Sequence, residues 1–446
     1  MQPYLPNTTA DEQAMLEVIG AASVDELFAS IPGELRMGRP LDLPPAMGEM
    51  QLTRHVSEIA AKNASAGDHV CFLGGGAYDH FIPAVVDTVA ARGEFYTAYT
   101  PYQAEASQGT LQAMFEYQTL IARLTGMDVS NASLYDGASA TAEAVLMALG
   151  ATRRRRVVAP RSLHPEYRQV LATYLANLDA ELVTLPTPEG TLDPQRLTDA
   201  VDEQTACVIV QHPNFFGCLE RAETLSRLAR EAGALTVGVV DPVSLGLLRR
   251  PGDWGADIVA AEGHGLGCPM AYGGPFLGIL ACTEKLLRRM PGRLVGETTD
   301  RRDRRCFVLT MQTREQHIRR EKATSNICTN QGLLALRASV HLALLGPRGL
   351  RQLGELCLQK ANYARERLTA EGRLSAAFEG AVFKEFVVRV ADGGVAHRLA
   401  HARAEGILAG VPLGRWYPEL ADCLLVAVTE KRTREEIDRL AEVLAE

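Results

Sequence analysis

Hydrophobic positions between residues 63 and 340 follow two alternating spacings. Short runs of β-branched and other apolar residues, such as 207–210 and 236–240, predict buried strands. Between such runs, apolar residues recur every three or four positions, as in 111–124 and 138–149, which predicts amphipathic helices. Because strands that alternate with helices form mostly parallel sheets covered on both faces, the pattern predicts a large α/β domain over 63–340.

The two ends of the chain show different patterns. Residues 1–62 carry short helix signals interrupted by prolines, which predicts a helical arm. Beyond residue 340, helix-like stretches are followed by a strand-like run at 382–390 and by a capping box at 433–436 (TREE) that opens the last helix. We therefore expect a smaller α/β domain over 341–446.

The composition limits the classes of function. The chain has 446 residues, of which 47% are hydrophobic and 22% charged, as in ordinary globular proteins. Its net charge of −8 argues against general binding to nucleic acid. No leader peptide or membrane-spanning apolar run is evident, and the nine cysteines form no Cys-x-x-Cys pair, so we expect free thiols in the cytoplasm.

Three polar features carry only weak signals. His397 and His401 lie four residues apart, but no glutamate or cysteine completes a ligand set, so we expect no metal site. The basic stretch 301–322 is expected to be an exposed charged helix rather than a docking face. Asp136 and Gly137 open a helix after a short strand and could present amide groups to an anion.

The candidate chemistry lies at 235–267. A buried strand ends in Asp241, a second short strand follows at 257–261, and a glycine-rich loop (EGHGLG) spans 262–267. This order is typical of pyridoxal-phosphate (PLP) enzymes, which need a lysine on the loop to hold the cofactor aldehyde as a Schiff base.

The glycine-rich loop lacks the required lysine. The residue after His264 is Gly265, and no lysine occurs between Lys62 and Lys285. Only 6 of the 46 basic residues are lysines, so a bias towards arginine could empty this stretch by chance. However, arginine does not lose its proton and cannot replace a catalytic lysine, so we favour a true loss of the tethering function.

Several stretches resemble the glycine cleavage system P protein, the glycine decarboxylase family. They include 72–80 (FLGGGAYDH), 95–105 (FYTAYTPYQAE), 131–137 (NASLYDG), 320–329 (REKATSNICT) and 407–415 (ILAGVPLGR). These motifs are specific together, although none is so alone, and they run through most of the chain. The chain is most similar to the first of the two subunits found in organisms that split this enzyme.

The resemblance implies an α/β, fold-type-I PLP-dependent transferase-like architecture with a mostly parallel seven-stranded sheet. It also implies a PLP-bearing second subunit in an α2β2 complex, which holds the cofactor covalently, decarboxylates glycine and passes the aminomethyl group to the lipoyl arm of H protein. This chain is then expected to hold no cofactor. Asp241, His264 and Gly265 would be remnants of a cofactor site, with the Asp241 carboxylate bound by neighbouring amides.

The resemblance also implies that this chain contributes residues to its partner's active site, since similar enzymes have their sites at a subunit interface. Thr324, Ser325 and Asn326 offer hydroxyl and amide groups in such a position. They are expected either to bind the phosphate of the partner's cofactor or to cap the helix that begins near Gly332.

An aromatic loop is the second candidate for such a contribution. Tyr99, Tyr102 and Gln103 lie in a loop interrupted by proline. This loop is expected either to line the glycine or lipoyl pocket or to pack in the subunit interface. For Asp79 and His80 we favour a structural role.

Two other functions stay open at this point. A cofactor-free chain with this frame could act as a scaffold or regulator without an obligate partner. A lone PLP enzyme would need Lys285 or Lys322 for the Schiff base, but Lys285 begins a helix beyond the sheet and is poorly placed. A neighbouring gene for a similar chain with His-Lys on the loop would favour the two-subunit enzyme.

Overall fold

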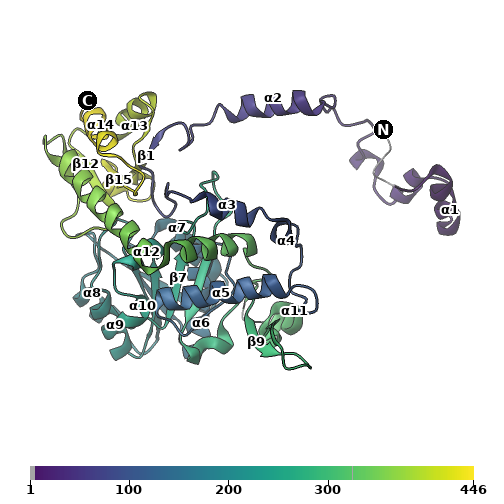
Figure 1. The fold of residues 1–446 in the computed structure, drawn as a ribbon, viewed down its shortest axis with the longest axis horizontal. Helices are drawn as coiled ribbons and strands as arrows, with labels where there is room; N and C mark the ends of the chain where they lie inside the picture. Colours follow the sequence, from purple (N-terminus) through teal and green to yellow (C-terminus); the bar gives the residue numbers. More distant parts are fainter. Residues whose placement is uncertain (1–5, 324) are drawn as a thin grey trace. The chain divides into compact units, whose positions relative to one another are not determined.

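The computed structural model describes residues 6–323 and 325–446 (Figure 1). The chain forms two compact units, and the division between them falls between Asn63 and Ala64. Prolines in the first unit, the arm, remove backbone donors and keep its helices short. These helices are α1 (Thr9–Ile19), η1 (Val24–Phe28), η2 (Gly33–Leu35) and α2 (Glu49–Ala60).

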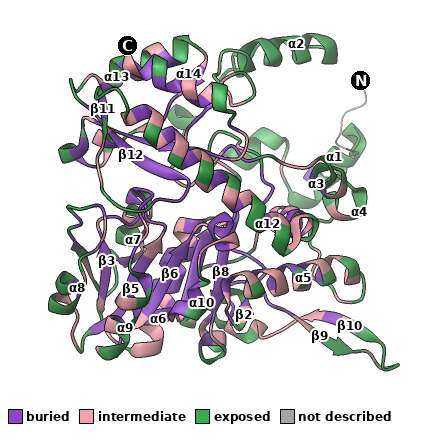
Figure 2. Cartoon of the chain, turned by 60° about the vertical axis from the view of Figure 1, so that its left-hand side comes forward, coloured by how far each residue is buried: buried purple, intermediate pink, exposed green. Residues whose placement is uncertain are grey.

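A seven-stranded sheet forms the centre of the second unit. Strands β3 to β7 are parallel, and β8 runs antiparallel to both of its neighbours, which confirms the predicted mostly parallel sheet. The central strands are buried (Figure 2), because helices cover both faces. The strand order is β2 (Val129–Ser130), β8 (Gly278–Cys282), β7 (Ile258–Glu262), β6 (Leu235–Val240), β5 (Thr205–His212), β3 (Arg156–Pro160) and β4 (Glu181–Leu185).

Two hydrophobic cores lie on opposite faces of this sheet. One core joins the sheet to α6 (Gly137–Thr152) and α7 (Pro165–Leu175). The other core contains the strand residues whose side chains point to the opposite face. It joins the sheet to α5 (Gln108–Thr125), α9 (Ala222–Glu231) and α12 (Gly332–Thr369). We call the sheet with these helices the large lobe. Its shorter helices are α3 (Ala84–Ala90), α4 (Gly93–Tyr96), α8 (Pro194–Ala200), η3 (Pro242–Gly246), α10 (Pro251–Trp254) and η4 (Glu284–Arg289).

A four-stranded sheet with its own helices forms the small lobe. The second half of α12 packs on this sheet, after a kink at Gly346 that precedes Pro347. Both lobes belong to one compact unit, so the expected domain boundary near residue 340 stays a prediction. The other elements are β11 (Leu374–Ala376), β12 (Glu385–Val390), β15 (Cys423–Ala427), β14 (Val411–Pro412), α13 (Val395–Ala404), α14 (Arg434–Ala445), η7 (Leu413–Arg415), η8 (Pro418–Leu420), and the parallel pair β1 (Val70–Cys71) and β13 (Ile407–Leu408).

The basic stretch 301–322 does not form the charged helix that we expected. It contains half of an antiparallel hairpin instead, because Phe307 is buried and packs on α5, where its ring centroid lies 5.4 Å from that of Phe115. The hairpin strands are β9 (Val295–Thr299) and β10 (Arg305–Leu309), and the turns after them are η5 (Gln312–Arg314), α11 (Gln316–Arg319) and η6 (Arg320–Lys322). Among the described residues, no helix has an apolar stretch long enough to span a membrane.

Candidate functional site

Strands β6 and β7 end where the sequence predicts cofactor chemistry. Asp241 follows β6, and Glu262 is the last residue of β7. Both carboxyl groups therefore lie at the carboxyl edge of the parallel sheet, where ligands bind in such folds. Tyr78, from the segment before the sheet, and Lys384, from the small lobe, line the same cavity.

The loop position that a tethering lysine would occupy is closed. Gly265 is buried, and a Cβ atom there would lie 3.3 Å from Cδ2 of His80 and 3.4 Å from Cγ2 of Val243. A longer side chain would therefore meet the imidazole directly. Lys285 and Lys322 are exposed and do not line the cavity, so neither is placed to serve a lone PLP enzyme.

Lys384, which the sequence did not single out, fills the site. Its ammonium nitrogen lies 2.8 Å from Oδ2 of Asp241, 3.0 Å from Nε2 of His80 and 3.5 Å from the ring centroid of Tyr78. The other Asp241 oxygen accepts a hydrogen bond from the Val243 amide, so one of the neighbouring amides that we expected does bind this carboxylate, and the ammonium of Lys384 binds its second oxygen. The sequence did carry one indication of this role, since Lys384 lies within an apolar, strand-like run. Such a strand is usually buried, and a buried ammonium group needs polar partners.

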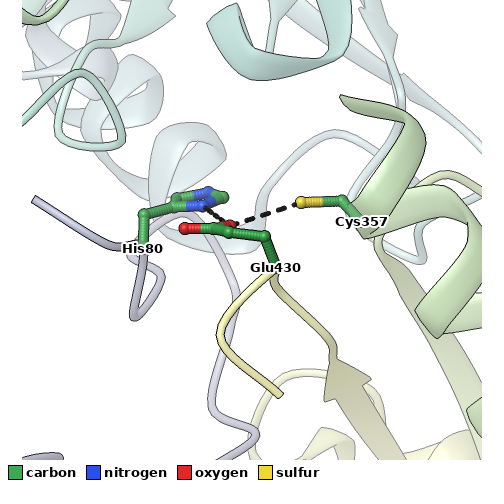
Figure 3. Close-up of side chains that lie close together, drawn as sticks. All are labelled: His80, Cys357 and Glu430. Carbon is green, nitrogen blue, oxygen red and sulfur yellow. Dashed lines mark hydrogen bonds and ion pairs between the residues drawn. The ribbon is translucent and has the colours of Figure 1, made fainter. Parts of the chain in front are cut away.

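His80 extends the hydrogen-bonded chain to the small lobe (Figure 3). Since Nε2 accepts from Lys384, Nδ1 carries the proton and donates to Oε2 of Glu430, 2.7 Å away. Burial and the neighbouring ammonium lower the pKa of His80, so the ring is neutral. Burial acts to raise the pKa of Glu430, but several smaller effects, led by the hydrogen bond from His80 and including the one from the Phe81 amide, together outweigh it and lower that pKa to about 2.

His80, Glu430 and Cys357 lie close enough together to resemble a metal site (Figure 3). The Cys357 sulfur is 3.6 Å from the same Glu430 oxygen, and burial raises the pKa of its thiol to about 12. A metal ion on Nδ1 of His80 would move the imidazole proton to Nε2, where it would face the ammonium of Lys384. The cluster therefore suits a hydrogen-bonded chain better than a metal ion.

Glu262 fills the end of the site that would take an anion. Its Oε2 accepts a hydrogen bond of 2.9 Å from the Gly137 amide at the start of α6, and its Oε1 accepts from the amides of His264 and Leu277. Asp136 caps the same helix end. Burial raises the pKa of Glu262 to about 8. The amides that the sequence offers to an anion are thus taken by carboxyl groups of the chain itself.

These contacts leave no room for PLP in the cavity at the carboxyl edge of the sheet. The cavity between Tyr78, Asp241, Glu262 and Lys384 has a volume of about 40 Å³, whereas a cavity that admits benzene measures roughly 150 Å³. Gly265 stands where the family resemblance leads us to expect the tethering lysine, an ammonium group pairs with Asp241, and a carboxyl group occupies the helix end. The residues present therefore do not fit the cofactor.

Nearly the whole chain is similar to known proteins. The family model of the glycine cleavage system P-protein matches residues 2–444. This chain belongs to that family. It is 53% identical over 442 residues to the probable glycine dehydrogenase (decarboxylating) subunit 1 of Carboxydothermus hydrogenoformans, with 99% of each chain covered.

Solved structures confirm the fold of this P-protein family member. A crystal structure of glycine decarboxylase (P-protein) in inhibitor-bound form matches with a TM-score of 0.89 and 43% identity, over 100% of this chain and 99% of the other. An alanine–glyoxylate aminotransferase from Nostoc sp. shares the fold with a TM-score of 0.59 at 18% identity, over 93% of this chain and 98% of the other. The expected PLP-dependent transferase-like fold is therefore confirmed.

The aromatic loop of this P-protein family member lies at the surface. Tyr99 is 95% exposed, and Gln103 is exposed as well. Tyr102 is held in place, because its hydroxyl donates to Oδ1 of Asn330 and the guanidinium of Arg293 lies 4.5 Å from its ring centroid. The two tyrosines and Asn330 line one pocket of about 250 Å³, which Gln103 does not reach.

The loop expected to bind the partner's phosphate makes contacts within the chain. Thr324 lies outside the described residues. Ser325 Oγ accepts from the Ile327 amide, and the Ser325 side chain acts to lower the pKa of the buried Glu143 carboxyl group. Asn326 accepts from a glutamine of α11. These contacts hold the loop but leave its role towards a partner untested.

The alternative role of this loop as a helix cap is wrong. Helix α12 begins at Gly332, its N-cap residue is Gln331, and no side chain caps it. Residues 324–326 precede this helix end by several residues. Their contribution to the partner's phosphate site stays a prediction.

Proposed function

We propose that this chain is the cofactor-free subunit of a two-subunit glycine decarboxylase, the P protein of the glycine cleavage system. The observation that carries the proposal is a PLP-transferase fold whose own cofactor site is filled by Lys384 and Glu262. The relative that matches 99% of the chain is named as subunit 1 of a decarboxylating glycine dehydrogenase, which supports a second subunit. A scaffold or regulator without a partner has no comparable support.

The partner subunit holds PLP covalently in this proposal, and the two chains form an α2β2 complex. When bound, PLP supplies the electron sink that decarboxylation of glycine requires, and the aminomethyl group passes to the lipoyl arm of H protein. This chain supplies hydrogen-bond donors and aromatic surface at the edge of the partner's site. The proposed contributors are Tyr99, Tyr102, Gln103, Thr324, Ser325 and Asn326.

The arm offers an apolar surface for this complex. Among residues 6–63 only Leu16 is buried, and large apolar side chains are exposed along the arm. On α2, Leu52, Val56 and Ile59 share one face, and each is at least half exposed. Exposed apolar area of this extent marks an interaction surface, and we assign it to the second subunit, since obligate interfaces are large and apolar.

The cysteines support a cytoplasmic location for the complex. All nine are free thiols, and most of them are buried. Free thiols persist in a reducing compartment, whereas secreted proteins commonly carry disulfides. We therefore assign the subunit to the cytoplasm.

Co-expression with a homologous chain that carries His-Lys on the glycine-rich loop tests this function. We expect glycine-dependent exchange of carbon dioxide only when both chains are present, with the cofactor recovered on the second chain. Each chain assayed alone is the control. Exchange by this chain alone would contradict the proposal, as would full activity of the second chain without it.

A further inference from the structure

We propose that Lys384 is a built-in ammonium ligand that takes the place of a cofactor and fixes the small lobe against the large lobe. In proteins that close around a ligand, contacts to the ligand hold two lobes together. Here the chain supplies the ligand from its own small lobe. The closed arrangement then needs neither cofactor nor substrate, and it does not depend on the partner subunit.

Three side chains surround the ammonium group, and we call Tyr78, His80 and Asp241 the Lys384 cage. The side chain of Lys384 is 2% exposed, and that of Asp241 is 14% exposed. An ammonium group has three donor hydrogens and no acceptor. The carboxylate, the imidazole lone pair and the ring face of the tyrosine match these properties, at 2.8, 3.0 and 3.5 Å.

The cage joins segments that are far apart in the sequence. Lys384 precedes β12 in the small lobe, Asp241 follows β6 in the large lobe, and His80 belongs to the segment before the large sheet. Glu385 holds the same segment through the amide of Gly75, 2.6 Å away. Moving the lobes apart would pull the ammonium from its carboxylate in a buried site, and an unpaired buried charge is costly.

Glycines let the two lobes approach each other very closely. A Cβ atom at Gly217 in the large lobe would lie 1.9 Å from the carbonyl oxygen of Glu385, and one at Gly74 would lie 2.2 Å from its carboxylate. Only a residue without a side chain permits such contacts. Together with the remaining cavity of about 40 Å³ around Asp241, Glu262 and Lys384, they leave little space for a ligand beside the ammonium group.

Hydrogen exchange of the full-length chain tests whether the lobes are fixed. Lys384→Met keeps the side-chain volume but removes the charge, Asp241→Asn keeps the carboxylate shape, and Lys285→Met is the matched control on an exposed lysine. We expect the amides of 72–82 and 385–390 to exchange roughly a hundredfold faster in both cage variants, and at the wild-type rate in the control. Equal exchange in all four proteins, or an increase spread evenly over the compact unit, would overturn the proposal.

Chemical rescue tests the ammonium site itself. Lys384→Ala removes the side chain beyond Cβ, and n-propylammonium has the length and charge of the missing part. We expect the thermal midpoint of this variant to fall by about 4–6 °C and to recover on addition of n-propylammonium chloride. Lys384→Met, in which the space is filled, should not respond. Failure of Lys384→Ala to recover, or equal recovery of both variants, would overturn the proposal.

X-ray scattering of the wild-type chain keeps the proposal testable if a cage variant does not fold. Lobes that are already fixed should give the same scattering profile with and without added PLP. A more compact profile after addition of PLP would show that the lobes still move, and would refute a fixed orientation.

Discussion

Gly265 lies directly against His80, so that a Cβ atom at residue 265 would be only 3.3 Å from Cδ2 of the imidazole. The imidazole cannot move aside freely, because its two nitrogens are bonded to Lys384 and Glu430. Residue 265 is therefore packed tightly against a group that belongs to a buried network of hydrogen bonds and ion pairs.

Gly265→Lys is expected not to create a cofactor site. The new side chain would collide with His80, and the cavity beyond it is filled, so overpacking should lower the free energy of unfolding by about 1–3 kcal/mol. Incubation with PLP followed by borohydride should leave no pyridoxyl group on the wild type or on the variant, by peptide mass spectrometry. Gly265→Ala is the control, because it adds only the Cβ atom and so separates the effect of replacing glycine from the effect of the rest of the lysine side chain. A stoichiometric adduct on Lys285 or Lys322 of the wild type would contradict the assignment of the cofactor to the partner.

Charge on the apolar face of α2 is expected to prevent assembly with the second subunit. Val56→Glu places a carboxylate in the face formed with Leu52 and Ile59, and it should weaken the complex at least roughly tenfold, because an interface core tolerates an unpaired charge poorly. Arg54→Glu on the opposite face is the matched control. Size-exclusion chromatography with light scattering measures the complex. Equal assembly of both variants would remove this face of the arm from the interface.

Ser325→Ala is expected to weaken retention of PLP in the complex without breaking assembly. A hydroxyl donor to a phosphate contributes about 1.5–3 kcal/mol, so the dissociation constant should rise by roughly 10–100-fold. Spectroscopic titration of the assembled complex measures it. Glu143→Gln is the control, since it alters the internal partner of Ser325 but keeps the hydroxyl. The same dissociation constant in the Ser325 variant as in the wild type would confine Ser325 to its internal contacts.

The buried carboxyl group of Glu143 is expected to make stability depend on pH. Burial raises its pKa from 4.5 to about 7, although the hydrogen bond from Ser325 opposes this rise. The neutral form is therefore favoured in the fold, and its contribution is complete below about pH 4.5 and lost as the pH rises to about 7. At about 1.4 kcal/mol for each pKa unit, the free energy of unfolding should fall by up to about 3 kcal/mol over this interval.

Urea unfolding at several pH values compares the wild type with Glu143→Gln. The amide cannot ionise, so the stability of the variant relative to the wild type should rise between pH 5 and about 7 and then level off. Other buried acids, such as Glu262 with its pKa of about 8, are present in both proteins and cancel in the difference. A difference that does not change with pH would show that Glu143 ionises as easily in the fold as in the unfolded chain.

Local signals in the sequence determined most of the elements and the class of fold. The capping box that begins at Thr433 opens α14, and the apolar spacing over 138–149 lies within α6. These features depend on neighbouring residues, so they are visible without a structure. The basic stretch 301–322 misled the prediction, because packing of Phe307 on α5 decided its conformation.

The sequence by itself also predicted, through Gly265 and the P-protein motifs, that a PLP enzyme frame lacks its lysine. Only the tertiary structure decided what took the place of the cofactor. Lys384 and His80 are separated by 304 residues, and Glu262 and Gly137 by 125. A lysine or glutamate in a sequence is most often a solvated surface residue. Folding alone brings these charges to their partners and excludes water around them, and this burial makes the contacts strong enough to close the site.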